Sequence, residues 1–290
     1  MYIPDIICTF AIQISIIFNM YIKATDIIST LLSMGDEWQR ENLMRFFKTG
    51  KGQYGEGDKF IGIKVPDTRI VVKEARLRVP LGEIEILLKS EWHEVRLCGF
   101  LLLVEEMKAA LPKARQVPTV NAERREEIAR FYLRHARRAN NWDLVDMSCP
   151  KILGKWLLYP KADGSMPDRN ILYQLAASSN LWEQRIAMVT CWMLIRADQY
   201  DDCLRLATIL LPHPHDLIHK AVGWMLREVG KRDMPTLEAY LNDHAHEMHR
   251  TTLRYAIEKM DENKRQYYMK CGVKSVDLGK TWIIDCLSRR

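Results

Sequence analysis

One tryptophan and one aspartate, Trp142 and Asp146, are the residues of this chain whose spacing most directly suggests chemistry. They follow Asn140 and Asn141, either of which can cap a helix, and residues four apart on a helix share a face. Asp143 falls in the first helical turn, where the helix dipole stabilises a carboxylate, so we assign it no catalytic role. Asp146 lies beside an aromatic ring instead. Alone, such an aspartate is usually a solvated or ion-paired surface residue, so its importance depends on its companions.

Aromatic and cationic side chains recur together on later segments with helical spacing. Trp182 is followed by Arg185, Lys220 precedes Trp224 by four residues, and Arg227 comes three residues later. A tryptophan in a repeated helix is usually a core residue, and we expect Trp182 to be buried. Trp224 has cations on its own face, which disfavours full burial. Such a stripe suits phosphate contacts combined with aromatic packing against a sugar or base.

Arginines are concentrated in residues 121–138. Glutamates in the first half of this segment favour a solvated helix with ion pairs between residues four apart. The last three arginines lack close acidic partners before Asp143, which makes them better candidates for contacts with a nucleic-acid backbone. Over the whole chain, the candidates for such contacts are Arg134, Arg137, Arg138, Lys220, Arg227, Arg250 and Arg254.

Metal and cofactor chemistry find little support in the sequence. Histidines cluster late in the chain, but His213 and His215 flank Pro214 in a predicted loop, and no cysteine or carboxylate completes an obvious ligand set. The glycine motifs of nucleotide-binding proteins and the motifs of common hydrolases are absent. We therefore expect no metal and no nucleotide or other cofactor. The seven cysteines are scattered without a Cys-x-x-Cys pair, which predicts reduced, buried thiols in a cytoplasmic protein.

The balance of 43 Lys and Arg against 37 Asp and Glu gives a net charge of +6, which is compatible with a nucleic-acid partner without indicating one. Residues 1–22 are rich in Ile and Phe and carry one charge, Asp5. Three interpretations of this segment remain open: an amphipathic terminal helix, a membrane anchor, or an extension from a misplaced start codon. Its polar interruptions would be costly in lipid, which favours the first and the third.

The pattern from Asp26 onward is helical almost throughout. Ile27–Phe47 is predicted as one amphipathic helix, and later helices form pairs at the roughly 30 to 40 residue spacing of helix-pair repeats. The predicted pairs are Leu81–Lys89 with Glu91–Met107, Val120–Arg138 with Trp142–Leu158, Ile171–Ala177 with Leu181–Ile195, Tyr200–Leu211 with Leu217–Val229, and Met234–Leu241 with Glu247–Met260. Because one pair cannot bury its apolar face alone, we predict an all-α fold, an α-solenoid with a concave side.

Taken in order, these phrases resemble the family of HEAT-like-repeat alkylpurine DNA glycosylases. The resemblance covers approximately residues 25 to 260. The phrases that carry it are Gly62-Ile63-x-x-Pro66-x-x-Arg69, Trp92-His93-Glu94-x-Arg96, Asn141-Trp142-Asp143-x-x-Asp146, Trp182-x-x-Arg185 and Lys220-Ala221-x-Gly223-Trp224. We accordingly predict an apolar N-terminal segment over residues 1–24, a domain of HEAT-like repeats with a concave basic face over residues 25–262, and a C-terminal tail over residues 263–290.

The resemblance implies that Asp146 is the catalytic carboxylate, that Trp142 and Trp224 line the site, and that Arg185 lies beside it, where it would hold a phosphate. The substrate would be double-stranded DNA with purines alkylated at N3 or N7, and the enzyme would act as a monomer. It further implies that the damaged base stays stacked, so that no deep base-binding cavity is needed. Two alternatives remain: a DNA-binding solenoid without catalysis, which would not need Asp146, and a protein-interaction scaffold, which would need neither Trp142 nor the cations.

Overall fold

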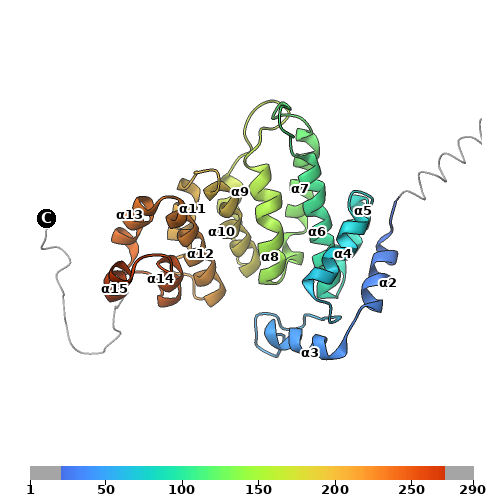
Figure 1. The fold of residues 1–290 in the computed structure, drawn as a ribbon, viewed down its shortest axis with the longest axis horizontal. Coiled ribbons are helices and arrows are strands. Elements are labelled where there is room, and N and C mark those ends of the chain that lie inside the picture. The colour runs from blue at the N-terminus through green and yellow to red at the C-terminus, as the bar shows by residue number, and fades with distance from the viewer. Residues whose placement is uncertain (1–20, 272–290) are drawn as a thin grey trace, which may run out of the picture. The chain divides into compact units, whose positions relative to one another are not determined.

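The structure is a computed structural model that describes residues 21–271. All secondary-structure elements within residues 21–271 are helical (Figure 1). The one β-type contact in that range is an isolated bridge between Lys59 and Trp92. The all-helical architecture confirms the predicted fold class and is consistent with an α-solenoid. Within residues 21–271, no helix has both the length and the apolar character needed to span a bilayer. The predicted segments 1–24 and 263–290 lie largely outside the described residues.

The chain divides into two compact units, one ending at Leu210 and one beginning at Leu211. The helices of the first unit are α2 (Ala24–Ser33), α3 (Glu37–Phe46), α4 (Val65–Ala75), α5 (Leu81–Lys89), α6 (His93–Ala110), α7 (Ala122–Arg134), the 3-10 turn η1 (Ala136–Arg138), α8 (Trp142–Cys149), the π-helical segment η2 (Pro150–Gly154), α9 (Asn170–Ala176), α10 (Leu181–Ile195) and α11 (Asp201–Leu210). Those of the second are α12 (Asp216–Arg232), α13 (Met234–His244), α14 (Arg250–Ala256) and α15 (Glu262–Cys271).

Two long helices, α6 and α10, form the centre of the first unit. Helix α6 packs against α4, α5, α7 and α8, and α10 packs against α8, η2, α9 and α11. Both are apolar on most of their circumference, as expected of helices that have neighbours on several sides. The predicted partners 81–89 with 91–107, and 171–177 with 181–195, are therefore adjacent in space. Helix α8, which carries Trp142 and Asp146, lies between the two central helices and contacts both.

The predicted helix over Ile27–Phe47 is wrong in one respect, because the structure divides it into α2 and α3. The break falls at Gly35, where a Cβ atom would lie 2.9 Å from the Ile61 side chain and 3.1 Å from its carbonyl oxygen. Asp36 then starts the second helix, since its carboxylate accepts a hydrogen bond from the backbone N–H of Gln39 at 2.7 Å. The break brings a distant loop against the chain, which periodicity alone does not reveal.

The predicted helix over Trp142–Leu158 is also interrupted, at Pro150. Proline has no backbone N–H, so it cannot donate to the carbonyl oxygen of Asp146 four residues earlier. The chain widens into the π-helical segment η2 at this point. Gly154, at the end of η2, allows close packing on α10, since a Cβ atom there would lie 2.8 Å from Cβ of Met193. The interruption thus fits α8 closely against the helix that carries Arg185.

Candidate active site

Asp146 and Arg185 form a paired ion bridge between α8 and α10. The Nε of Arg185 donates to Oδ1 of Asp146 at 2.9 Å, and its Nη2 donates to Oδ2 at 2.7 Å. This is the fork geometry in which a guanidinium matches a carboxylate, and it fixes the plane of the carboxylate. The Asp146 side chain is 16% exposed and that of Arg185 6%. The carboxylate is therefore held by a buried cation while keeping limited access to solvent.

Opposing effects act on the pKa of the Asp146 carboxyl. Burial raises this pKa, the charge and hydrogen bonds of Arg185 lower it, and the nearby charge of Asp143 raises it further. The net result is a pKa above the ordinary value of an aspartate. Because Arg185 counteracts the effect of burial on this pKa, it favours the ionised form of Asp146.

A half-open, mainly apolar pocket of about 270 Å³ lies beside this ion pair. Asp146 and Met147 line it from α8, with Phe46 and Phe47 at the end of α3 and Trp142 at the start of α8. The Trp142 ring is half-buried and stacks on the ring of Phe47, with centroids 5.4 Å apart. The Phe46 ring meets Trp142 edge-on at 5.9 Å and is itself exposed. The two phenylalanines were not singled out from the sequence, where they only close an amphipathic run.

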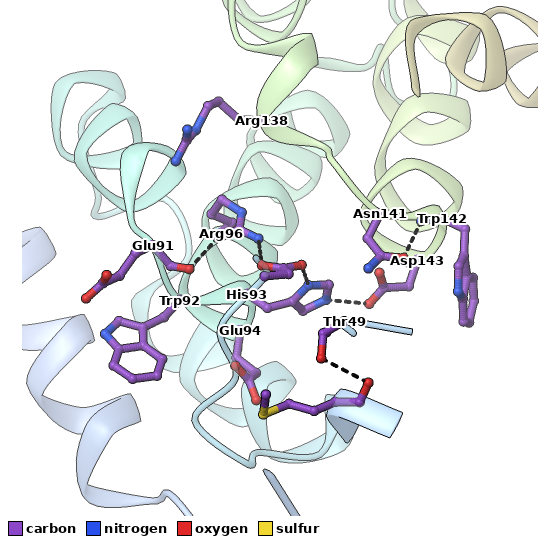
Figure 2. Close-up of polar contacts among 12 residues, drawn as sticks. Thr49, Glu91, Trp92, His93, Glu94, Arg96, Arg138, Asn141, Trp142 and Asp143 are labelled. Atoms are coloured by element: carbon purple, nitrogen blue, oxygen red, sulfur yellow. Dashed lines mark hydrogen bonds and ion pairs between the residues drawn. The ribbon is translucent and has the colours of Figure 1, made fainter. Parts of the chain in front are cut away.

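A network of buried charges fixes the start of α8 to α6 (Figure 2). The ring of His93 bonds through Nδ1 to Oδ2 of Asp58 at 2.8 Å and through Nε2 to Oδ2 of Asp143 at 2.9 Å. Arg96 pairs with the same Asp58. Burial alone would lower the pKa of His93, but the carboxylates of Asp143 and Asp58 outweigh it and raise that pKa to about 9. Asp143 is therefore an ion-paired, buried residue, and Asn141 is the helix cap, accepting from the Trp142 N–H at 2.9 Å.

Glu94, which belongs to α6, fixes the loop that precedes α4 against that helix. Its buried carboxylate accepts hydrogen bonds from the backbone N–H groups of Ile61, Gly62 and Ile63, at 2.9, 2.9 and 3.1 Å. Gly62 has a φ of +100°, and a Cβ atom there would lie 2.0 Å from the Asp36 carbonyl oxygen. The loop therefore holds the start of α3, the helix whose last turn contributes to the Trp142 pocket. The phrases Gly62-Ile63 and His93-Glu94-x-Arg96 thus build the support of the site.

The predicted DNA contacts of the first unit have structural partners. Arg134 is exposed, with its guanidinium 5.7 Å from the Phe131 ring centroid. Arg137 is 72% exposed and pairs with Glu183 of α10 at 3.0 Å. Its acidic partner is distant in the sequence, which is why the sequence did not predict it. Arg138 donates to the backbone carbonyl oxygens that end α5, those of Leu88, Lys89 and Ser90. Arg138 therefore stabilises a helix end, and its DNA contact stays a prediction.

The remaining predicted residues belong to the second unit. Trp224 is half-buried on α12, in agreement with the expectation that it is not a full core residue. Lys220 pairs with Asp216 at 2.7 Å, and Arg227 pairs with Glu258. Arg250 donates to the carbonyl oxygen of Met269 at 2.6 Å, and Arg254 is exposed. Their roles in binding, and that of Trp224 in catalysis, stay predictions.

The late histidines gather around one hollow of the second unit. The rings of His219 and His249 stack at 4.1 Å, and His219 bonds through Nε2 to the His213 carbonyl oxygen at 2.5 Å. No group of three or more metal-ligating side chains in residues 21–271 is arranged to hold a metal ion.

The fold and site together describe an all-helical repeat protein in which one carboxylate, fixed by an arginine, lies beside an aromatic pocket. The sequence profile of the family described as DNA alkylation repair enzyme matches residues 27–260, and the chain belongs to that family. Membership assigns it to the repair of alkylated DNA. A solved structure, a predicted DNA alkylation repair enzyme from Enterococcus faecalis, is similar in fold, with a TM-score of 0.55 and 16% sequence identity over 79% of this chain and 97% of that one. A comparison with curated proteins gave no match.

Proposed function

We propose that this protein is a DNA glycosylase that hydrolyses the N-glycosidic bond of purines alkylated at N3 or N7 in double-stranded DNA. The observation that carries the proposal is the Asp146 carboxylate, which Arg185 orients by two hydrogen bonds at the edge of a pocket that Trp142 also lines. The earlier predictions of monomeric action, cytoplasmic location and independence from cofactors remain part of this proposal.

The chemistry needs few groups because the substrate is already activated. A purine alkylated at N3 or N7 carries a positive charge and departs as a neutral base, so no general acid has to protonate it. This differs from ordinary glycoside hydrolysis, in which a second carboxyl group acts as the acid. The remaining tasks are to stabilise an oxocarbenium-like sugar and to place a water molecule. We assign both to the ionised carboxylate of Asp146, which is partly accessible from the pocket.

Arg185 acts through Asp146 in this proposal. The Nε and Nη2 groups of its guanidinium both donate to the Asp146 carboxylate, and its side chain is nearly inaccessible. We therefore replace the role implied by the resemblance, a phosphate contact, with that of a positioning residue. Arg185 keeps the carboxylate ionised against the effect of burial and fixes its orientation.

Trp142 provides the aromatic surface of the site. The Phe47 ring stacks on the Trp142 ring, which is nevertheless partly exposed and lines the pocket. An indole face near a cationic sugar contributes about 0.5–2 kcal/mol. Trp224 is assigned the same role through the family resemblance. The pocket is half open, which suits a base that remains in the helix stack better than one flipped into a closed cavity.

The test is release of free base from DNA that contains 7-methylguanine or 3-methyladenine. The wild-type protein is incubated with the modified duplex and with an unmodified duplex of the same sequence, and released bases are separated by chromatography. The proposal expects release from the modified duplex only. Salt-dependent binding of both duplexes without release would instead favour the DNA-binding alternative, and the absence of binding would favour a protein-interaction scaffold.

A further inference from the structure

A second hollow of the first unit is lined mainly by basic side chains. This cationic pocket of about 380 Å³ lies between α4, α6 and η2. Its charged lining consists of Arg69 and Lys73 from α4, Arg76 directly after α4, Lys108 and Glu105 from α6, and Lys151 from η2. Five cations thus face one carboxylate. None of these residues is among the predicted DNA contacts, and none belongs to the pocket beside Asp146.

The positive charge of this pocket is neutralised only in part, by the single carboxylate of Glu105. Lys108 pairs with Glu105 at 3.5 Å. Within residues 21–271, Arg69, Lys73 and Arg76 form no ion pair with a carboxylate, and neither does Lys151. Arg69 and Lys73 are four residues apart and share one face of α4, Arg76 follows directly after the helix, and all three are exposed. Burial and the charge of Arg69 lower the pKa of Lys151, and the charge of Glu105 opposes them only in part. An anionic ligand would relieve this repulsion.

The cationic pocket adjoins the candidate active site through one residue. Met147 lines the pocket beside Asp146, and its sulfur lies 3.6 Å from Nη2 of Arg69. Lys151 follows Asp146 by five residues, directly after the interruption at Pro150. Phosphates of one DNA strand recur about every 3.4 Å along the duplex axis. The Met147 contact therefore brings Arg69 next to the pocket that Asp146 lines, at the scale of neighbouring phosphates of one strand.

We propose that the cationic pocket binds a backbone phosphodiester of the DNA strand that passes Asp146, and so positions the damaged nucleotide. The inference rests on the proposed function, because it takes alkylated DNA as the ligand. Contacts with phosphates fix the register of a protein on a duplex without reading its sequence. The pocket would therefore bind intact and damaged DNA alike.

The test compares two triple variants of the full chain for binding to an unmodified duplex at several salt concentrations. The first carries Arg69→Gln, Lys73→Gln and Arg76→Gln, and Gln has a helix propensity similar to that of Arg and Lys. The control carries Lys59→Gln, Lys89→Gln and Arg130→Gln, which removes the same net charge at exposed sites that already have acidic partners. Circular dichroism verifies that both variants are folded.

The logarithm of the association constant falls with the logarithm of the salt concentration, and each lost phosphate contact should make this decline shallower by about 0.9. It should also weaken binding about eightfold at 0.1 M salt. We expect this change in the first variant, a smaller one in Lys151→Gln, and a wild-type slope in the control. Equal slopes in the two triple variants would overturn the inference, as would saturable binding of inorganic phosphate that the first variant loses while its duplex slope is unchanged. Because unmodified DNA is used, a failure of base release contradicts only the proposed function, and an unchanged slope contradicts only this inference.

Discussion

The histidine at the centre of the buried network makes the stability of the first unit depend on pH. His93 has a pKa of about 9 in the folded state against 6.5 for an unperturbed histidine. A folded pKa above the unfolded one means that the proton stabilises the native state. The stabilisation is complete below about pH 6.5 and is lost as pH rises through about 9. Since one pKa unit corresponds to about 1.36 kcal/mol, the full effect is about 3 kcal/mol.

This loss should be visible in urea unfolding followed by circular dichroism between pH 6 and pH 9.5. The unfolding free energy of the wild type should fall by roughly 3 kcal/mol over that range. Asp143→Asn removes one of the two carboxylates that raise the pKa of His93, so the decline should move to lower pH. His93→Gln should remove the decline altogether if the variant folds. A decline of the same size and position in the wild type and in Asp143→Asn would refute the reasoning, since His93 would then not be its source.

Three further predictions concern the hydrogen bonds between Glu94 and the loop before α4, the conformation of Gly62 in that loop, and the ion pair of Arg185 with Asp146. Glu94→Gln should destabilise the protein by about 2 kcal/mol, measured by urea unfolding, because an amide cannot serve three buried N–H donors as a carboxylate does. Gly62→Ala should cost more than about 1 kcal/mol in the same assay, since φ is +100° and the added methyl group meets Asp36; a neutral effect would show that the loop is not fixed. Arg185→Lys should slow base release and move the acidic limb of its pH profile to higher pH, because the pKa of Asp146 rises when the paired hydrogen bonds are lost; an unmoved limb would contradict the positioning role.

Two helices were predicted with both ends correct. Leu81–Lys89 and Leu181–Ile195 match α5 and α10 at both termini. For α10 the reason is local, because the Asn180 side chain caps the first turn. The breaks at Gly35 and Pro150 were missed for different reasons. The first depends on contact with a loop 26 residues away, whereas Pro150 could have been taken as an interruption from its chemistry alone.

In the candidate site, too, residues close in sequence could be predicted to lie together, whereas contacts between distant residues could not. Trp142 and Asp146 were found because helical spacing places them on one face. Arg185 was also found, but its partner lies 39 residues away, and only the structure shows that it binds the carboxylate. The role of His93 likewise depends on Asp58, 35 residues away in a loop.

The cationic pocket was not predicted for a similar reason. Its residues come from three separate elements, and acidic residues lie between them in the sequence. Net charge and local charge runs therefore gave no indication of it.

The proposed chemistry depends most on the Asp146 carboxylate, and its role is tested by single-turnover release of 7-methylguanine from duplex DNA. Asp146→Asn keeps the size of the side chain and can still accept one hydrogen bond from Arg185, and Asp201→Asn on α11 is the matched control at an exposed aspartate. Removing one electrostatic contact to a transition state typically costs about 10²–10³ in rate. We expect a loss of that order in Asp146→Asn, with folding retained and the control unchanged. Release by folded Asp146→Asn at the wild-type rate would contradict the account.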